Sequence, residues 1–290
     1  MRRLLPLLLP ALFLCCAQSP TEPSLPAGTK VEKNLSYSQY PQTVLDVYVP
    51  GDASGRNGKR CGVLNIHGGG WVGGRKENNV ERFVLPWLGR GCVVANVEYR
   101  LADVAPAPAA VEDVLQAAHW FQKNAKRYGV DEKRIIATGD SAGGHLALMA
   151  GLTPKSAGLG PTGAIAAVVN FYGITDVEDQ LGGENMRKYA VTWVPAGTDG
   201  RMELARRVSP LSWVRKGAPP VLTIHGTADP TVPYEHGVRL TKALRDAGSD
   251  AEFISVPNAE HGRPVEQFNA VWPQIFDFLS RRKLIGDQSH

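Results

Sequence analysis

RIIATGDSAGGHLALMA, the stretch at residues 134–150, decides the fold. It begins with a short apolar run, which favours a buried strand, and from Gly143 onward it has the composition of a helix. Between the two parts lies G-x-S-x-G with Ser141 at its centre. Gly139 and Gly143 permit a sharp turn, because a Cβ at either position would collide across it. The pattern predicts a serine hydroxyl lifted above a sheet near a helix N-terminus. An ordinary glycine-rich turn with an incidental serine is the alternative.

A second glycine-rich turn follows the strand expected at 61–66. It reads HGGGW, residues 67–71. Three consecutive glycines expose backbone N–H groups that no side chain shields, and such groups can bind a developing oxyanion. A glycine run alone is more typical of a flexible loop. The serine turn later in the chain favours oxyanion binding, because the two turns form a mechanistic pair.

Asp229 and His261 are the residues expected to complete this site. A serine nucleophile needs a general base, and the base needs a carboxylate that orients it. Asp229 follows the strand expected at 221–225, and His261 follows the strand expected at 252–256. Both therefore belong at the carboxyl edge of the sheet with Ser141, where open α/β sheets bind their ligands.

The competing histidines and acids are less suitable because of their places in the chain. His261 alone follows the acid and lies in a loop after the last expected strand. Glu235 falls within an expected helix, and Glu260 adjoins His261 and should point elsewhere. We expect His67 to brace the glycine loop and His119 to be structural. The remaining histidines lie in helices, at a strand end or at the terminus: His145, His236, His225 and His290.

Strands and helices alternate along the chain, which predicts one α/β domain with a mostly parallel central sheet flanked by helices. Residues 174–208 lack a regular pattern and are expected to be a short insertion that acts as a lid or a pocket wall. Further strands are expected at 45–49, 91–99 and 164–170, and further helices at 111–128, 234–248 and 268–284.

The composition is that of an ordinary globular protein, with 43% hydrophobic and 21% charged residues and a net charge of +4 over 290 residues. Length alone would allow one or two domains, and no second core is visible in the pattern. No run of lysine or arginine is interleaved with aromatic residues, so the composition does not favour nucleic-acid binding.

The amino terminus has the pattern of a secretory signal. Two arginines precede an apolar stretch, and Ala17 ends a group of small residues that suits cleavage. The protein is therefore expected to be secreted or periplasmic. Cys15 or Cys16 could instead carry a lipid anchor, and no segment is long enough to span a membrane. The expected divisions are a signal peptide at 1–17, a linker at 18–35 and a catalytic domain at 36–285.

Four short motifs resemble one family of esterases. HGGGW at 67–71 and GDSAGG at 139–144 are similar to the paired signatures of hormone-sensitive-lipase-like esterases in the α/β-hydrolase superfamily. LDVY at 45–48 and EYRL at 98–101 resemble the branch of bacterial feruloyl- and acetyl-esterase-type enzymes. The resemblance implies the α/β-hydrolase fold over most of the chain. It also implies a nucleophile, a base, an orienting acid and an oxyanion hole, supplied by Ser141, His261, Asp229 and the N–H groups of Gly69, Gly70 and Ala142.

These residues predict a secreted serine carboxylesterase that acts on short-chain, aryl or acetyl esters and needs neither a metal nor an organic cofactor. An amidase or peptidase would use the same residues, and a hydrolase-fold binding protein without catalysis is the alternative from another class. Residues 18–44 leave little room for a large N-terminal cap, so we expect short acyl chains. Four aromatic residues could line a substrate pocket or pack elsewhere: Trp71, Phe171, Tyr172 and Trp193.

Cys61 and Cys92 are the two cysteines that would remain after signal cleavage. In the family fold their strands are neighbours, and each cysteine precedes its strand's outgoing loop by a similar interval. An oxidising compartment would permit a disulfide between them. Two separate buried thiols are the alternative, because the directions of the side chains are not evident from the sequence.

Overall fold

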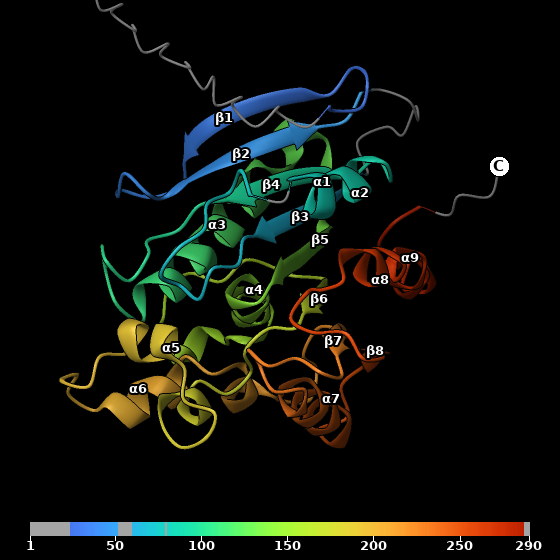
Figure 1. Cartoon of the computed structure of the whole chain (residues 1–290). Coiled ribbons are helices and arrows are strands. Elements are labelled where there is room, and N and C mark those ends of the chain that lie inside the picture. The colour runs from blue at the N-terminus through green and yellow to red at the C-terminus, as the bar shows by residue number, and fades with distance from the viewer. Residues whose placement is uncertain (1–23, 52–59, 79, 287–290) are drawn as a thin grey trace, which may run out of the picture.

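A computed structural model describes residues 24–51, 60–78 and 80–286 of the chain (Figure 1). The expected signal peptide, with Cys15 and Cys16, lies outside the described residues. The strands are β1 (Lys30–Ser36), β2 (Val44–Val49), β3 (Arg60–Ile66), β4 (Val93–Val97), β5 (Val130–Asp140), β6 (Ala167–Phe171), β7 (Val221–Gly226) and β8 (Ala251–Val256).

In the described part of the chain these strands form one 8-stranded sheet in the order β1-β2-β4-β3-β5-β6-β7-β8. β2 runs antiparallel to both of its neighbours, and every other pair is parallel. The predicted mostly parallel sheet is therefore confirmed. In a parallel arrangement the loops after β3, β5, β7 and β8 all leave the sheet at one edge, which brings the glycine loop, Ser141, Asp229 and His261 to the same side.

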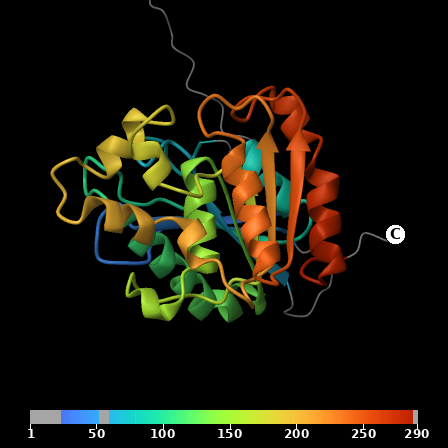
Figure 2. The same ribbon diagram turned by 90° about the horizontal axis from the view of Figure 1, so that it is seen from below.

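Helices cover both faces of the sheet, and each face has its own core. The α-helices are α1 (Val80–Phe83), α2 (Leu85–Leu88), α3 (Ala109–Asn124), α4 (Ala142–Leu152), α5 (Lys188–Trp193), α6 (Arg201–Arg207), α7 (Glu235–Asp246), α8 (Val265–Asn269) and α9 (Trp272–Arg281). Leu64 faces the core with α3, α4 and α7, whereas Val63 faces the core with α1, α2, α8 and α9. Successive residues of a strand point to opposite faces, so the apolar β3 supplies both cores. Figure 2 shows α7 and α9 on opposite sides of β7 and β8.

The structure corrects two boundaries. β1 begins at Lys30, so the linker predicted at 18–35 is wrong from that residue on. Among the described strands β1 pairs with β2 alone, and an exposed edge strand needs no continuous apolar run. The single helix predicted at 268–284 is two helices, α8 and α9, because Pro273 is suited to the first turn of a helix and not to its interior.

The predicted insertion, residues 174–208, contains the short helices α5 and α6 and a 3₁₀ turn over Glu178–Leu181. These elements lie to one side of α4 (Figure 2). No clear pattern in the sequence marks α1 and α2, which have only one turn each. No helix of the described residues is long and apolar enough to cross a membrane.

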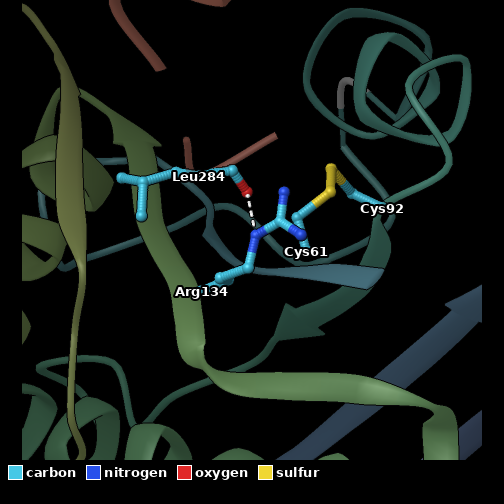
Figure 3. The surroundings of a disulfide bond; sticks show 4 residues. All are labelled: Cys61, Cys92, Arg134 and Leu284. Carbon is cyan, nitrogen blue, oxygen red and sulfur yellow. Dashed lines mark hydrogen bonds between the residues drawn. A yellow bond between two sulfur atoms is a disulfide. The ribbon is translucent and has the colours of Figure 1, made fainter. Parts of the chain in front are cut away.

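Cys61 of β3 and Cys92, just before β4, form a disulfide with Cα atoms 4.7 Å apart (Figure 3). Gly62 pairs with Val93 in the parallel register, so the cysteines lie opposite one another and project from the same face. The structure therefore contains the disulfide and not two separate buried thiols. Beside it, the Nε–H of Arg134 donates to the carbonyl of Leu284 at 2.9 Å.

Candidate active site

Ser141 lies on the tight turn between β5 and α4. Its backbone has φ 54° and ψ −120°, a conformation that is strained for a residue with a side chain. A Cβ on Gly139 would come within 2.4 Å of the Ile66 carbonyl oxygen, and a Cβ on Gly143 would come within 2.0 Å of the same atom. β3 thus passes so close to the turn that only glycine fits at both positions. The sequence GDSAG therefore produces the sharp turn that it predicts.

The structure brings the three predicted triad side chains into one hydrogen-bonded chain. His261 Nε2 lies 2.9 Å from Ser141 Oγ, and His261 Nδ1 lies 2.7 Å from Asp229 Oδ2. A carboxylate only accepts hydrogen bonds, so Nδ1 carries the proton and Nε2 is left to accept from the serine hydroxyl. The Asp229 side chain is fully buried, whereas that of His261 is 20% exposed. This arrangement leaves a basic nitrogen directed at the serine.

Backbone and side-chain donors hold Asp229 as a carboxylate. Its Oδ1 accepts the N–H groups of Thr231 at 2.8 Å and Val232 at 2.9 Å. Its Oδ2 lies 3.3 Å from Nε2 of His225. Burial raises the pKa of the Asp229 carboxyl, but the hydrogen bonds from His225 and His261 outweigh it, so the pKa lies well below its ordinary value.

His225 is a member of the site that sequence reasoning missed. It ends β7, and its fully buried Nε2 also lies 3.0 Å from the Val232 carbonyl. The signal was the spacing of four residues between His225 and Asp229 in the turn that follows a strand. The same spacing also suits a purely structural histidine, so the pattern alone does not separate the two roles.

The glycine loop faces the serine turn from the end of β3. Gly69 and Gly70 have φ of +125° and +61°, which favour glycine. The N–H of Gly68 donates to Asp140 Oδ1 at 3.0 Å, so the residue before the serine anchors the loop. Ala142 is the first residue of α4, and its N–H has no acceptor within the helix. The three N–H groups implied for the oxyanion hole thus come from a loop and a helix start that both adjoin Ser141.

His67 braces the glycine loop, as the sequence predicts. Its ring stacks on Tyr99 with centroids 4.4 Å apart, and the Tyr99 hydroxyl donates to the His67 carbonyl at 3.1 Å. His67 Nε2 lies 3.0 Å from Glu98 Oε1, and Glu98 Oε2 accepts the N–H of Lys76 at 3.0 Å. Residues 98 and 99 of the EYRL motif therefore hold the glycine loop in place through His67.

All four aromatic residues that could line a pocket or pack elsewhere are buried in the two cores. Trp71 and Trp193 are fully buried and stack on one another at 4.2 Å, and Trp71 Nε1–H donates to His145 Nδ1 at 3.1 Å. Phe171 is 1% exposed and packs in the other core. Large aromatic side chains fill cores as readily as pockets, so residue type alone does not distinguish the two. Tyr172 is also buried, but it contacts the site, with its ring centroid 4.7 Å from that of His261.

A cavity of about 680 Å³ opens beside His261. Tyr172, Asp140, Arg82 of α1 and the loop after β8 line it. The Nη1 of Arg82 donates to the Gly262 carbonyl at 3.3 Å and so links α1 to this loop. Arginine, glutamate and asparagine side chains contribute to the wall, which makes the cavity suited to a polar group. Among the described residues, no group of three or more His, Cys, Asp or Glu side chains could hold a metal ion.

The chain is similar to known esterases in sequence. Residues 45–244, well over half of the chain, match the model of the family BD-FAE. The esterase LipC of Mycobacterium tuberculosis is 30% identical over 240 residues, which are 79% of this chain and 59% of the relative. The esterase LipQ of the same organism is 29% identical over 76% of this chain and 54% of its own length. The chain thus spans between half and three fifths of these curated relatives.

Two solved structures share the fold over almost their whole length. A truncated carbohydrate esterase from gut microbiota has a TM-score of 0.74 and 28% identity, and the match covers 87% of this chain and 95% of that one. The apo form of esterase 2 from Thermogutta terrifontis has a TM-score of 0.73 and 26% identity over 92% of this chain and 98% of its own. The expected α/β-hydrolase fold is thus confirmed.

Proposed function

The chain belongs to the BD-FAE family of α/β-hydrolases, and from this premise we propose that it is a serine carboxylesterase. The observation that carries the proposal is the continuous chain of hydrogen bonds from Ser141 through His261 to Asp229. Relatives named as esterases support the same reaction class. A non-catalytic binding protein would have no need to maintain the strained turn at Ser141, which costs about 1–3 kcal/mol.

Ser141 Oγ attacks the ester carbonyl carbon while its proton passes to Nε2 of His261. The carbonyl oxygen becomes an oxyanion, which the N–H groups of Gly69, Gly70 and Ala142 stabilise. When the tetrahedral intermediate collapses, the C–O bond to the alcohol breaks, and the alcohol leaves with the proton from Nε2. The product of this half-reaction is an acyl-serine.

Water completes the reaction. The water oxygen attacks the acyl carbon while His261 Nε2 takes a proton from that water molecule. A second oxyanion then forms in the same oxyanion hole. When this second tetrahedral intermediate collapses, the bond between the acyl carbon and Ser141 Oγ breaks. Ser141 Oγ regains the proton from His261 Nε2, and the carboxylic acid departs. The buried Asp229 carboxylate holds the His261 tautomer and stabilises the imidazolium in both halves.

For the substrate we propose an ester with a short or aryl acyl group and a polar alcohol. The alcohol must leave close to His261, because it takes its proton from this residue, and the cavity beside His261 has a polar wall. Secretion, or a lipid anchor at Cys15 or Cys16, is proposed from the leader pattern at residues 1–17 alone.

The decisive experiment compares the wild-type chain with Ser141→Ala on p-nitrophenyl acetate and on a matched p-nitroanilide. Rapid ester hydrolysis that the substitution abolishes, while circular dichroism stays unchanged, is the expected result. Residual esterase activity well above the buffer rate in the variant would contradict the role of Ser141. A higher kcat/KM for the anilide would favour an amidase, and no turnover of either compound by the wild type would favour a binding protein.

A further inference from the structure

Arg187, in the insertion just before α5, is bound to the turn that carries Asp229. Its Nε–H donates to the Thr231 carbonyl at 2.8 Å, and an Nη2–H donates to the Pro230 carbonyl at 2.9 Å. The Nη1 of Arg187 donates to the Met186 carbonyl at 3.0 Å, within the insertion itself. These acceptors are backbone carbonyls, and a guanidinium offers several donors in a fixed fork that suits two adjacent carbonyls.

The two carbonyls belong to the residues that directly follow Asp229. From inside the turn, Asp229 Oδ1 accepts the N–H groups of Thr231 and Val232. From outside, Arg187 holds the carbonyls of Pro230 and Thr231. The turn is therefore fixed on both sides, and a shift of its backbone would move Asp229 Oδ2 away from its contact of 2.7 Å with His261.

Tyr189, two residues further along, joins the same turn to the glycine loop. An added Cβ on Gly70 would lie 2.9 Å from both Cβ and Cγ of Tyr189, so the base of this side chain packs directly on the loop. Its hydroxyl donates to Gln180 Oε1 at 2.9 Å and lies 3.4 Å from the Thr231 carbonyl. Tyr189 thus spans the distance between Gly70 and the turn after Asp229.

We propose that Arg187 and Tyr189 are positioning residues, through which the insertion sets the geometry of the catalytic acid and of the oxyanion loop. The proposal rests on the proposed esterase function. Neither residue donates to or accepts from a reacting atom. Arg187 acts through the backbone of residues 230 and 231, and Tyr189 acts through Gly70 and Thr231. The insertion is then part of the catalytic apparatus and not only a wall of the pocket.

The test compares Arg187→Ala, Arg187→Lys, Tyr189→Phe and a matched control, Arg206→Ala. Arg206 lies in the same insertion, but its exposed side chain pairs with Glu178. A loss of catalytic geometry lowers kcat, whereas a loss of substrate contacts raises KM. For Arg187→Ala we expect kcat to fall by about 10- to 100-fold, with KM nearly unchanged, because small displacements in a catalytic site have effects of this order.

Rescue separates positioning from general damage to the fold. Guanidinium chloride at low millimolar concentration should restore part of kcat in Arg187→Ala and have no such effect on Arg206→Ala. Arg187→Lys should retain an intermediate kcat, because an ammonium can reach one of the two carbonyls but lacks the fork. Tyr189→Phe keeps the ring on Gly70 and loses the bridge to Thr231, so a smaller fall in kcat is expected.

Equal kcat values for Arg187→Ala and Arg206→Ala would overturn the proposal, as would a rise in KM alone. If melting curves show that Arg187→Ala does not fold, Arg187→Lys and Tyr189→Phe are compared with Arg206→Ala instead. A fall in kcat with KM nearly unchanged supports the proposal, and kcat values equal to that of Arg206→Ala overturn it. Wild-type activity in the same assay separates this outcome from a failure of the esterase function, since an inactive wild type would refute the function itself.

Discussion

At the scale of single residues, Asp229 shows how one side chain fixes the chemistry of another. Its Oδ1 is occupied by two backbone N–H groups, so only Oδ2 faces His261. In Asp229→Asn the amide oxygen should keep the Oδ1 position, and the NH₂ group would then face His261 Nδ1. That nitrogen would have to accept, and the proton would move to Nε2, where it blocks the uptake of a proton from Ser141.

We therefore expect Asp229→Asn to lower kcat by about 10⁴-fold, the order seen when this tautomer is reversed in serine hydrolases. The stability of the fold should change little, because the two backbone hydrogen bonds to Oδ1 are kept. Steady-state kinetics with p-nitrophenyl acetate, together with a thermal melt, test both parts. A loss of less than tenfold would show that the carboxylate does not set the tautomer.

His145 should make folding dependent on pH. Its Nδ1 accepts from Trp71, its Nε2 lies 2.7 Å from the Val208 carbonyl, and burial lowers its pKa to about 4. The unfolded chain has an ordinary histidine pKa of about 6.5, so below that pH the unfolded state binds a proton that the folded state rejects. This contribution to stability is complete above pH 6.5 and is lost as the pH falls towards 4, by about 2 kcal/mol between pH 7 and 5.

Urea denaturation of the wild type and of His145→Gln at pH 7 and pH 5 measures this contribution. The wild type should lose more of its free energy of unfolding on acidification than the variant does. The variant should keep some dependence on pH, because burial also lowers the pKa of His236. An identical loss in both proteins would contradict the assignment.

Sequence reasoning singled out Ser141, Asp229 and His261 because each lies directly after a strand, in the chain order of the fold, with Ser141 between two diagnostic glycines. It left open whether Trp71 and Trp193 line a pocket or pack in the core, because the face on which an aromatic residue lies depends on packing that no local pattern encodes. It missed Arg187 for a related reason. The contacts of Arg187 span more than forty residues and join an irregular segment to a turn, so neither periodicity nor a motif marks them.

At the scale of elements, the disulfide joins two parallel strands at the edge opposite the active site. The equal spacing from each cysteine to the end of its strand was visible in the sequence, but the register that places Gly62 opposite Val93 was not. The bridge closes a loop with a sequence separation of 31. On the chain-entropy model it therefore stabilises the protein by about 3.7 kcal/mol.

The double substitution Cys61→Ser with Cys92→Ser should lower the free energy of unfolding by about that amount, and kcat at 25 °C should be unchanged. The reason is that the bridge ties only the start of β3, whereas the glycine loop follows its other end. Denaturation curves and esterase assays on the same samples test both expectations. A large fall in kcat without a change in stability would mean that the bridge acts on the active site.

At the scale of the whole molecule, the first strand of the described residues lies at the edge of the sheet. Residues 30–36 form β1, a largely exposed strand beside β2, so this part of the chain does not form a helical cap above the serine. The insertion covers the site in its place, and the base of Tyr189 packs directly on Gly70. Residues 30–36 therefore supply no helical apolar wall for a long acyl chain.

We expect kcat/KM to be highest for acyl groups of about six carbons or fewer, because a longer chain would extend into water without gaining contacts. A series of p-nitrophenyl esters from acetate through butyrate and octanoate to dodecanoate tests this, with Ser141→Ala measured in parallel to subtract uncatalysed hydrolysis. A feruloyl ester in the same series asks whether a flat aryl group is accepted. Faster turnover of dodecanoate than of acetate or butyrate would show that an apolar channel opens in solution and would refute the expectation.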